Sequence, residues 1–455
     1  MSSAGKVRRL AAITLAAGAA TTVVASGAAN AWNGDRTSDV RHAVQGGKAR
    51  NVILLIGDGM GDSEITIARN YSQGAAGRLN MDRLPLTGAY TTYALQKANP
   101  NLPDYVTDSA ASGTGWATGR KSYNGAISVT PDGKPQQTIL ELAKRAGYRT
   151  GDVTTAELTD ATPAVLASHV VDRGCQGPAD MKNCPTNAKE NGGAGSIAEQ
   201  EVQTGADVYL GGGKARFAQT VKAGRFQGKT VVDQAKAAGY DVVTDVNGLQ
   251  SARPGKNGRL LGLFSDGNMP QEWTGPLAKT GGTDPSRCAP NDKFSGPHLT
   301  QMTSKALNVL DDQTRHGKKG FFLQVEGASI DKRDHAADPC GQIGETVEFD
   351  KAVKLARDYA RQHPDTLVVT TADHGHTSQI IPLDAQSPGQ TATLVTDEGA
   401  QMKINYATNP AGQSQEHTGT QVRIAAQGPQ AANVVGVTNQ TDLFGTINRA
   451  LGLRH

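Results

Sequence analysis

Two stretches of the chain combine carboxylates with imidazoles in patterns that suit a metal ion. Residues 370–376 (TTADHGH) hold one carboxylate and two imidazoles, a combination that zinc and similar borderline metals prefer. In residues 326–335 (EGASIDKRDH), an aspartate and a histidine are spaced i, i+4, so a helix would place both on one face. An ordinary charged helix surface is the alternative for this second stretch. The candidate ligands are Glu326, Asp331, His335, Asp373, His374 and His376.

Two further segments add single candidates. Residues 57–63 (GDGMGDS) place Asp58 between two glycines. A glycine-rich phosphate loop is the alternative, but neither GxGxxG nor GxxxxGK[ST] is present, so the carboxylate is better placed to reach a metal. His417, beside Glu416 in a polar stretch, is uninformative by itself.

Ser109 is a candidate nucleophile in the run TDSAASGTG. Small residues follow it, so Ser109 could open a helix whose backbone N–H groups and dipole face an anion. A helix-capping serine is one alternative, and a Ser-His-Asp triad is another, in which a metal could also replace the histidine base. This stretch alone does not choose between them.

Residues 160–173 contain four polar candidates. The side-chain oxygens of Asp160 and Thr162 suit a hard ion such as magnesium. The guanidinium fork of Arg173 suits bidentate contact with a phosphate, and His169 lies close by. Taken singly, each of these residues is more typical of a turn or a surface than of a binding site.

The elements that must position these residues are strands and helices in alternation. Residues 51–57, 319–326 and 366–372 are apolar, β-rich runs, and residues 138–146 and 344–362 carry the 3.6-residue apolar period of helices. This pattern predicts an α/β fold with a large, mostly parallel central sheet and helices on both faces. Ligands of such folds gather at the carboxyl ends of strands, which is where the candidate residues fall.

The N-terminus has the pattern of a signal peptide. Basic residues at positions 6, 8 and 9 precede an uncharged run at 10–29, and Ala29-Asn30-Ala31 offers a cleavage site. A membrane anchor is the alternative, but this run is only weakly hydrophobic. We therefore expect cleavage of residues 1–31 and export, either secreted or periplasmic, with the Sec and twin-arginine routes both open.

The remaining chain is predicted to be a flexible or partner-docked arm at 32–50 and a single catalytic domain at 51–455. No later segment reaches the roughly 18 apolar residues of a membrane span. The chain has 46 basic and 43 acidic residues, and residues 1–31 contribute three basic and no acidic ones. The mature protein is therefore close to neutral, which argues against a nucleic-acid partner.

Four cysteines, at positions 175, 184, 288 and 340, fit an exported protein with two disulfides. Three pairings are possible, and the sequential one is the simplest. A zinc site of four thiolates is the alternative, but the CxxC spacing that such sites usually need is absent.

Taken together, these stretches closely resemble the alkaline phosphatase family, especially its periplasmic and secreted bacterial members. The resemblance runs from about Arg50 to Leu453 and includes the strings GDGMGDSEIT, TDSAAS, TAELTDATPA, EGASIDK, DPCGQIGETV, TADH and QEHTG. It implies a three-layer sandwich fold and the sequential disulfides Cys175–Cys184 and Cys288–Cys340. Gly113 and Gly115 depart from the alanine-like residues that some relatives carry, which should affect helix packing more than chemistry.

The resemblance also implies a role for each candidate. Two zinc ions and one magnesium ion per chain are implied, with Ser109 as nucleophile, Arg173 as phosphate clamp and Lys332 as a water-mediated phosphate contact. His376 and Glu416 would support the ligands, and Asp160 would reach the magnesium through water. The first zinc would be held by Asp331, His335 and His417, the second by Asp58, Asp373 and His374, and the magnesium by Asp58, Thr162 and Glu326.

The implied activity is the hydrolysis of small phosphate monoesters at alkaline pH, through a phosphoserine at Ser109, in the service of phosphate scavenging. Two zinc ions would stabilise the attacking and leaving oxygens of an in-line displacement. A homodimer is implied by the resemblance alone. A phosphodiesterase, a sulfatase and a phosphate-binding protein without catalysis are the alternatives.

Overall fold

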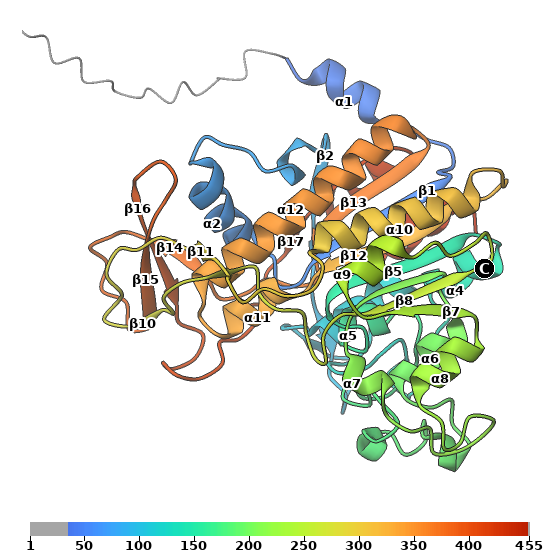
Figure 1. Cartoon of the computed structure of the whole chain (residues 1–455). Helices are drawn as coiled ribbons and strands as arrows, with labels where there is room; N and C mark the ends of the chain where they lie inside the picture. The colour runs from blue at the N-terminus through green and yellow to red at the C-terminus, as the bar shows by residue number, and fades with distance from the viewer. Residues whose placement is uncertain (1–34, 454–455) are drawn as a thin grey trace, which may run out of the picture. The chain divides into compact units, whose positions relative to one another are not determined.

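In the computed structural model, which describes residues 35–453, the largest element is a ten-stranded sheet (Figure 1). Only β17 runs against its neighbours, so the expectation of a mostly parallel sheet is confirmed. The order is β18 (Gly436–Asn439), β2 (Leu86–Thr91), β17 (Val422–Gln427), β13 (Thr366–Ala372), β1 (Asn51–Gly57), β12 (Phe321–Gly327), β5 (Arg149–Glu157), β6 (Val208–Gly212), β8 (Arg259–Leu263) and β7 (Tyr240–Val243).

The three strands expected from the sequence lie side by side in the middle of this sheet. β1 and β13 have the expected bounds, and every residue in them is buried, because continuous apolar runs belong to strands covered on both faces. β12 begins two residues later than expected, since Lys319 remains exposed outside the sheet.

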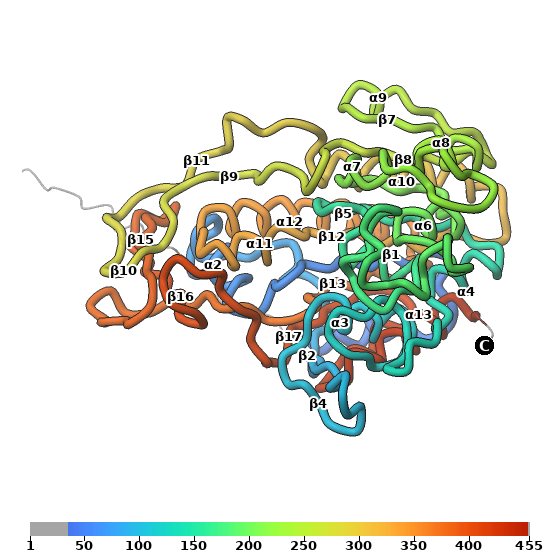
Figure 2. Tube along the Cα trace, turned by 90° about the horizontal axis from the view of Figure 1, so that it is seen from below, coloured from blue at the N-terminus to red at the C-terminus, as the bar shows by residue number. Residues whose placement is uncertain are grey.

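Helices cover both faces of the sheet, as expected. Figure 2 shows α10 (Leu299–Thr314) and α12 (Pro339–Gln362) on one side of the central strands, and α3 (Ser109–Thr118), α4 (Ile139–Arg145) and α13 (Asp442–Leu451) on the other. The other helices are α1 (Thr37–Ala43), α2 (Asp62–Gln73), α5 (Ala161–Ala164), α6 (Ile197–Thr204), α7 (Lys214–Phe217), α8 (Val231–Ala237), α9 (Val246–Ser251) and α11 (Ser329–His335).

Capping explains where two of the expected helices begin. α12 starts five residues before the expected position, because the Asp338 side chain accepts the Gly341 N–H at 2.9 Å and Pro339 occupies the first turn. α4 starts one residue later than expected, because Thr138 is its cap and forms a capping box with Glu141.

A smaller sheet packs at one end of α2 and α12 (Figure 1). Its strand order is β10 (Lys279–Thr280), β15 (Gln390–Val395), β16 (Gln401–Tyr406) and β14 (Gln379–Ile381). Apolar side chains of β15 and β16 bury against Ile67 and Tyr71 of α2 and Ile343 of α12. Two short pairs complete the strands: β9 (Trp273–Thr274) with β11 (Ala289–Pro290), and β3 (Ala94–Leu95) with β4 (Pro103–Asp104).

Both sequential disulfides are present, Cys175–Cys184 and Cys288–Cys340. The expected signal peptide at 1–31 lies outside the described residues. Within the expected arm at 32–50, the described residues include the short helix α1, and the buried Ala49 donates its N–H to the Ala450 carbonyl at 2.8 Å. Among residues 35–453, we find no helix that is both long and apolar enough to cross a bilayer.

Two interior glycines of α3 offer a test of how tightly this helix packs. A Cβ at Gly115 would lie 3.7 Å from its nearest neighbours, on Gln440, whereas a Cβ at Gly113 would lie 2.8 Å from Val165 Cγ2. We expect Gly115→Ala to raise the free energy of unfolding by roughly 0.5–1 kcal/mol, because alanine restricts the unfolded chain. Gly113→Ala should raise the free energy of unfolding by less than this, or lower it. Thermal denaturation of both variants measures the difference, and destabilisation by Gly115→Ala would contradict the described packing.

Candidate active site

The register of the central strands brings the candidate residues to one edge of the sheet. Gly57, the last residue of β1, is paired with Gly327 of β12 and with Ala372 of β13. The residues that follow β1 and β13 are Asp58 and Asp373, so their carboxylates meet beyond the same edge. All strands here are parallel, which is why three remote segments converge.

Asp331, His335, His376 and His417 form the first of two compact groups, here called the imidazole group. The Asp331 Oδ1 atom lies 3.3 Å from His335 Nε2, 3.2 Å from His376 Nε2 and 3.2 Å from His417 Nε2. Asp331 and His335 share one face of α11, as their i, i+4 spacing predicts. His417 reaches the group from the polar segment after β16, and no local sequence pattern marks that approach.

The hydrogen bonds of each imidazole indicate which nitrogen carries its proton. His335 Nδ1 faces the Gln415 carbonyl, and His417 Nδ1 lies 3.0 Å from the Thr107 carbonyl. A carbonyl can only accept, so these Nδ1 atoms must be the donors. The Nε2 lone pairs of both rings are then free to point into the group, which is the arrangement that a bound metal requires.

His376 has the opposite arrangement. Its Nδ1 accepts the N–H of Thr377 at 2.9 Å, so the ring proton is on Nε2, which faces Asp331 Oδ1. Burial lowers the pKa of His376 to about 4, so the ring is neutral at physiological pH. His376 is therefore suited to donating to Asp331 and not to binding a metal, although it lies as close as the other two rings.

The second group, here called the carboxylate group, consists of Asp58, Asp373 and His374. His374 Nε2 lies 3.4 Å from Asp58 Oδ1 and 3.2 Å from Asp373 Oδ2. Ser109 Oγ lies 3.5 Å from Asp58 Oδ1 and 3.4 Å from His374 Nε2. Ser109 is the first residue of α3 and is only 3% exposed. The His374 ring stacks on His417, with centroids 3.6 Å apart, so the two groups are in contact.

The carboxylates of these groups lack the partners that buried charges need. Asp373 Oδ1 accepts the backbone N–H groups of Gly59 and His374, both at 2.9 Å, but Oδ2 has no hydrogen-bond partner among the described residues. Asp331 Oδ1 is near the Nε2 atoms of three imidazoles, including that of His376, but forms no hydrogen bond of good geometry with any described group. Burial and the neighbouring charge of Asp58 raise the pKa of Asp373 well above its ordinary value. Cations would satisfy these oxygens, so the residues present fit metal ions.

Two further side-chain oxygens that could bind an ion are those of Glu326, near the end of β12, and of Thr162, which contacts the same strand. Burial, with the charge of Asp58 next in importance, raises the pKa of Glu326 well above its ordinary value. The hydroxyl of Thr162 is buried without a partner in the described part of the chain, and the backbone carbonyl of the same residue accepts from Gln324 of β12 at 2.9 Å. Carboxylate and hydroxyl oxygens fit a hard ion such as magnesium.

A network of charges lies beside these groups. Arg173 Nη1 contacts Asp108 Oδ2 at 3.1 Å, Arg173 Nη2 contacts Asp160 Oδ1 at 2.8 Å, and Lys332 Nζ contacts Asp160 Oδ2 at 3.1 Å. Burial alone would raise the pKa of Asp160, but Lys332 and Arg173 outweigh it and hold that pKa well below its usual value. Asp160 therefore remains charged and keeps both cationic side chains in place. Asp108 was not identified from the sequence, where Ser109 itself was considered as the cap, but the structure shows that Asp108 caps α3.

Two residues named in the sequence lie outside these groups. His169 Nε2 pairs with Glu141 at 3.0 Å, and His169 Nδ1 faces the Ser128 carbonyl at 3.0 Å. Glu416 is exposed and accepts from Asn409 at 3.0 Å. Neither side chain has a described contact with the imidazole or the carboxylate group.

The geometry is that of a buried serine oxygen beside cation-binding groups and an arginine, which can bind and attack an anionic ester.

Comparisons with known proteins agree with this interpretation of the site. The sequence model described as alkaline phosphatase matches residues 49–413 and 385–453 in two overlapping segments. The chain is 57% identical to alkaline phosphatase H of Pseudomonas aeruginosa (92% of this chain, 89% of the relative) and 54% identical to alkaline phosphatase of Escherichia coli (95% and 92%). It is 56% identical to streptomycin-6-phosphate phosphatase of Streptomyces griseus (89% and 91%).

Solved structures show the same fold. Alkaline phosphatase from the Antarctic bacterium TAB5 superimposes with a TM-score of 0.69 at 23% identity, covering 90% of this chain and 100% of that one. The Thermus thermophilus enzyme gives 0.67 at 25% identity, covering 93% and 96%. From the sequence match, the shared fold and the converging groups, the chain belongs to the alkaline phosphatase family of enzymes, which hydrolyse phosphate monoesters.

Proposed function

We propose that this enzyme hydrolyses phosphate monoesters through a phosphoserine at Ser109, with two zinc ions and one magnesium ion bound per chain. The observation that carries the proposal is the surroundings of His374 Nε2. Asp58, Asp373 and Ser109 Oγ all lie within 3.5 Å of that nitrogen or of each other. Two carboxylates, an imidazole and a hydroxyl whose electron-rich atoms lie this close together in a buried place favour a cation bound between them.

The same observation argues against a Ser-His-Asp triad. A triad needs a carboxylate at the imidazole nitrogen opposite the serine, to orient the ring and stabilise its positive charge. His374 Nδ1 instead lies 3.2 Å from the Gly375 carbonyl, and both carboxylates are on the serine side of the ring. His374 is therefore suited to be a ligand and not a general base.

The ligand sets of the proposal follow from the two groups. Asp331, His335 and His417 would hold one zinc ion, and Asp58, Asp373 and His374 the other. Asp58, Thr162 and Glu326 would hold magnesium, with Asp160 nearby. A solved structure of a TAB5 alkaline phosphatase mutant, in which a histidine is replaced by aspartate, is described with Mg bound in its M3 site. Such ions supply Lewis acidity, which lowers the pKa of a bound hydroxyl and offsets charge on a departing oxygen.

The chain's own residues then provide binding and attack. Each terminal nitrogen of Arg173 has a second N–H, so the guanidinium could contact two phosphate oxygens while Asp108 and Asp160 hold it. Lys332 would add positive charge beside them. Ser109 Oγ would bond to phosphorus as the ester P–O bond breaks, with its proton going to solvent and the alcohol taking one from solvent. Water would then attack phosphorus, which frees inorganic phosphate and returns a proton to Ser109 Oγ.

The first test is removal of the nucleophile. We expect Ser109→Ala to lower kcat on p-nitrophenyl phosphate by several orders of magnitude, because no other described hydroxyl is placed to form the covalent intermediate. Ser168→Ala is the matched control, since Ser168 is also buried and donates to Ala164 at 2.7 Å within its own turn. Near-normal turnover by a folded Ser109→Ala protein would refute the covalent step. Faster turnover of the corresponding diester or sulfate by the unmodified enzyme would refute the monoesterase assignment.

The second test separates the ligating imidazoles from His376. We expect His417→Ala to bind one zinc ion fewer per chain than the unmodified protein, because a direct ligand is lost. His376→Ala should keep that ion with an affinity weaker by about 10–100-fold, as is usual when a residue that orients a ligand is removed. Zinc content by mass spectrometry after dialysis at graded free zinc measures both effects. Activity that survives exhaustive chelation would contradict the metal requirement.

A homodimer and export are the remaining parts of the proposal. Export is supported by the two disulfides, which persist in oxidising compartments. The dimer rests on the family resemblance, and the exposed Val435 (52%) and Val437 (67%) at edge strand β18 offer apolar surface to a second copy. Light scattering on the mature protein should give a dimeric mass, and a monomeric mass at working concentrations would count against a dimer.

A further inference from the structure

A third group of potential metal ligands lies apart from the candidate active site. Glu272, His298 and Glu348, here called the Glu-His-Glu group, have ligand atoms within 4.8 Å of one another. Glu272 directly precedes β9, His298 caps the start of α10, and Glu348 lies in the middle of α12. None of the three belongs to the imidazole or the carboxylate group, and the proposed phosphatase chemistry does not use them.

The imidazole of this group is held in place before any ion binds. The His298 ring stacks on Phe294 with centroids 4.3 Å apart and planes 8° apart. The backbone N–H of His298 donates to the Gln301 side chain at 2.9 Å, which fixes the residue at the start of α10. His298 Nδ1 lies 2.9 Å from both carboxylate oxygens of Glu272, a contact shared between the two oxygens that brings the ring nitrogen against the carboxylate.

The two carboxylates are shielded, while the imidazole faces solvent. The side chains of Glu272 and Glu348 are 10% and 6% exposed, and that of His298 is 45% exposed. Glu348 Oε1 accepts from the N–H and hydroxyl of Thr300 at 3.1 and 2.6 Å, which fixes its direction. An ion could therefore enter beside His298 and meet oxygens that are already oriented.

Carboxyl groups outnumber cationic side chains around the Glu-His-Glu group. A third carboxyl, Glu345, accepts the Glu272 N–H at 2.8 Å, and burial raises the pKa of Glu345 to about 8. Burial also raises the pKa of Glu272, with Glu348 adding to the shift and His298 and Lys351 opposing it. Lys351 contacts Glu348 at 3.0 Å, but its side chain is 59% exposed, and solvent therefore screens its charge. A divalent cation would offset the remaining repulsion.

We propose that Glu272, His298 and Glu348 bind a fourth metal ion, a divalent transition metal of the zinc class, at a site separate from the active site. One imidazole and two carboxylates are ligands that such ions accept, and solvent can complete the coordination. The ion would tie the segment before β9 and the start of α10 to α12. The Cys288–Cys340 disulfide already ties the same long connection to the first turn of α12, so the metal would be a second attachment.

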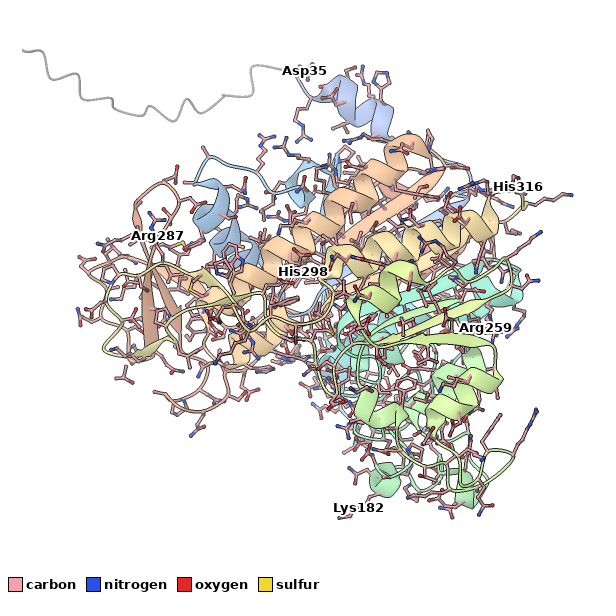
Figure 3. The ribbon with its side chains drawn as sticks, in the orientation of Figure 1. Asp35, Lys182, Arg259, Arg287, His298 and His316 are labelled. Atoms are coloured by element: carbon pink, nitrogen blue, oxygen red, sulfur yellow. A yellow bond between two sulfur atoms is a disulfide. The ribbon has the colours of Figure 1, made fainter. Side chains whose placement is uncertain are left out.

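The test is zinc stoichiometry in matched variants. After dialysis against zinc buffered at a micromolar free concentration, we expect His298→Ala and Glu348→Gln each to bind one zinc ion fewer per chain than the unmodified protein. Glu348→Gln keeps the volume and one acceptor for Thr300, so it serves if His298→Ala folds poorly. His316→Ala is the control, because His316 is an exposed histidine beyond the opposite end of α10 (Figure 3). It should bind as much zinc as the unmodified protein.

Two results distinguish this site from the phosphatase centre. His298→Ala should retain turnover of p-nitrophenyl phosphate within about twofold, and combining it with His417→Ala should remove one further zinc ion. Equal zinc content in the unmodified protein, His298→Ala and Glu348→Gln would overturn the proposal and leave an ordinary histidine–glutamate ion pair. That outcome would not affect the proposed activity, which depends on other residues.

Discussion

The active site depends on one constraint, the parallel register of β13, β1 and β12. Because these strands end together, the chain must place Asp58, Asp373 and Glu326 close to one another in a region that water scarcely reaches. Repulsion among these carboxylates is unfavourable for the protein alone, as the raised pKa values of Asp373 and Glu326 indicate. Because a bound cation would relieve this repulsion, the edge of the sheet favours cation binding. The surrounding fold keeps the carboxylates in place.

Two cationic side chains partly neutralise the negative charge that gathers at this edge of the sheet. Lys332 and Arg173 converge on Asp160, and Arg173 also contacts Asp108. Asp108 in turn accepts the Ala111 N–H at 2.9 Å as the cap of α3. One carboxylate thus caps the helix that begins with Ser109 and also contacts Arg173, whose support it shares with Asp160. The placement of Ser109 is therefore linked through a single side chain to the placement of the nearby positive charge.

Sequence reasoning identified the central strands, and most of the residues that the structure brings together beside them, for physical reasons. Unbroken apolar runs such as residues 51–57 leave little choice between strand and helix, and ligands that cluster within a few residues, as at 373–376, are visible at once. His417 was uninformative because its partner, the Thr107 carbonyl, is remote in sequence. The proton position on His376 depends on the N–H of Thr377, a detail of backbone direction that residue types do not encode. Glu272, His298 and Glu348 come from three separate segments, so no spacing signalled them.

The stacked rings of His374 and His417 have a consequence for metal binding itself. Each ring belongs to a different group, yet their centroids are only 3.6 Å apart and their planes differ by 18°. If one ring moves to bind the ion of its own group, the position of the other ring must therefore change as well. Binding of an ion to one group would therefore be coupled to binding at the other, and by thermodynamic linkage the influence would be equal in both directions. The two groups would then load as linked sites, so the affinity measured at one would depend on whether the other is occupied.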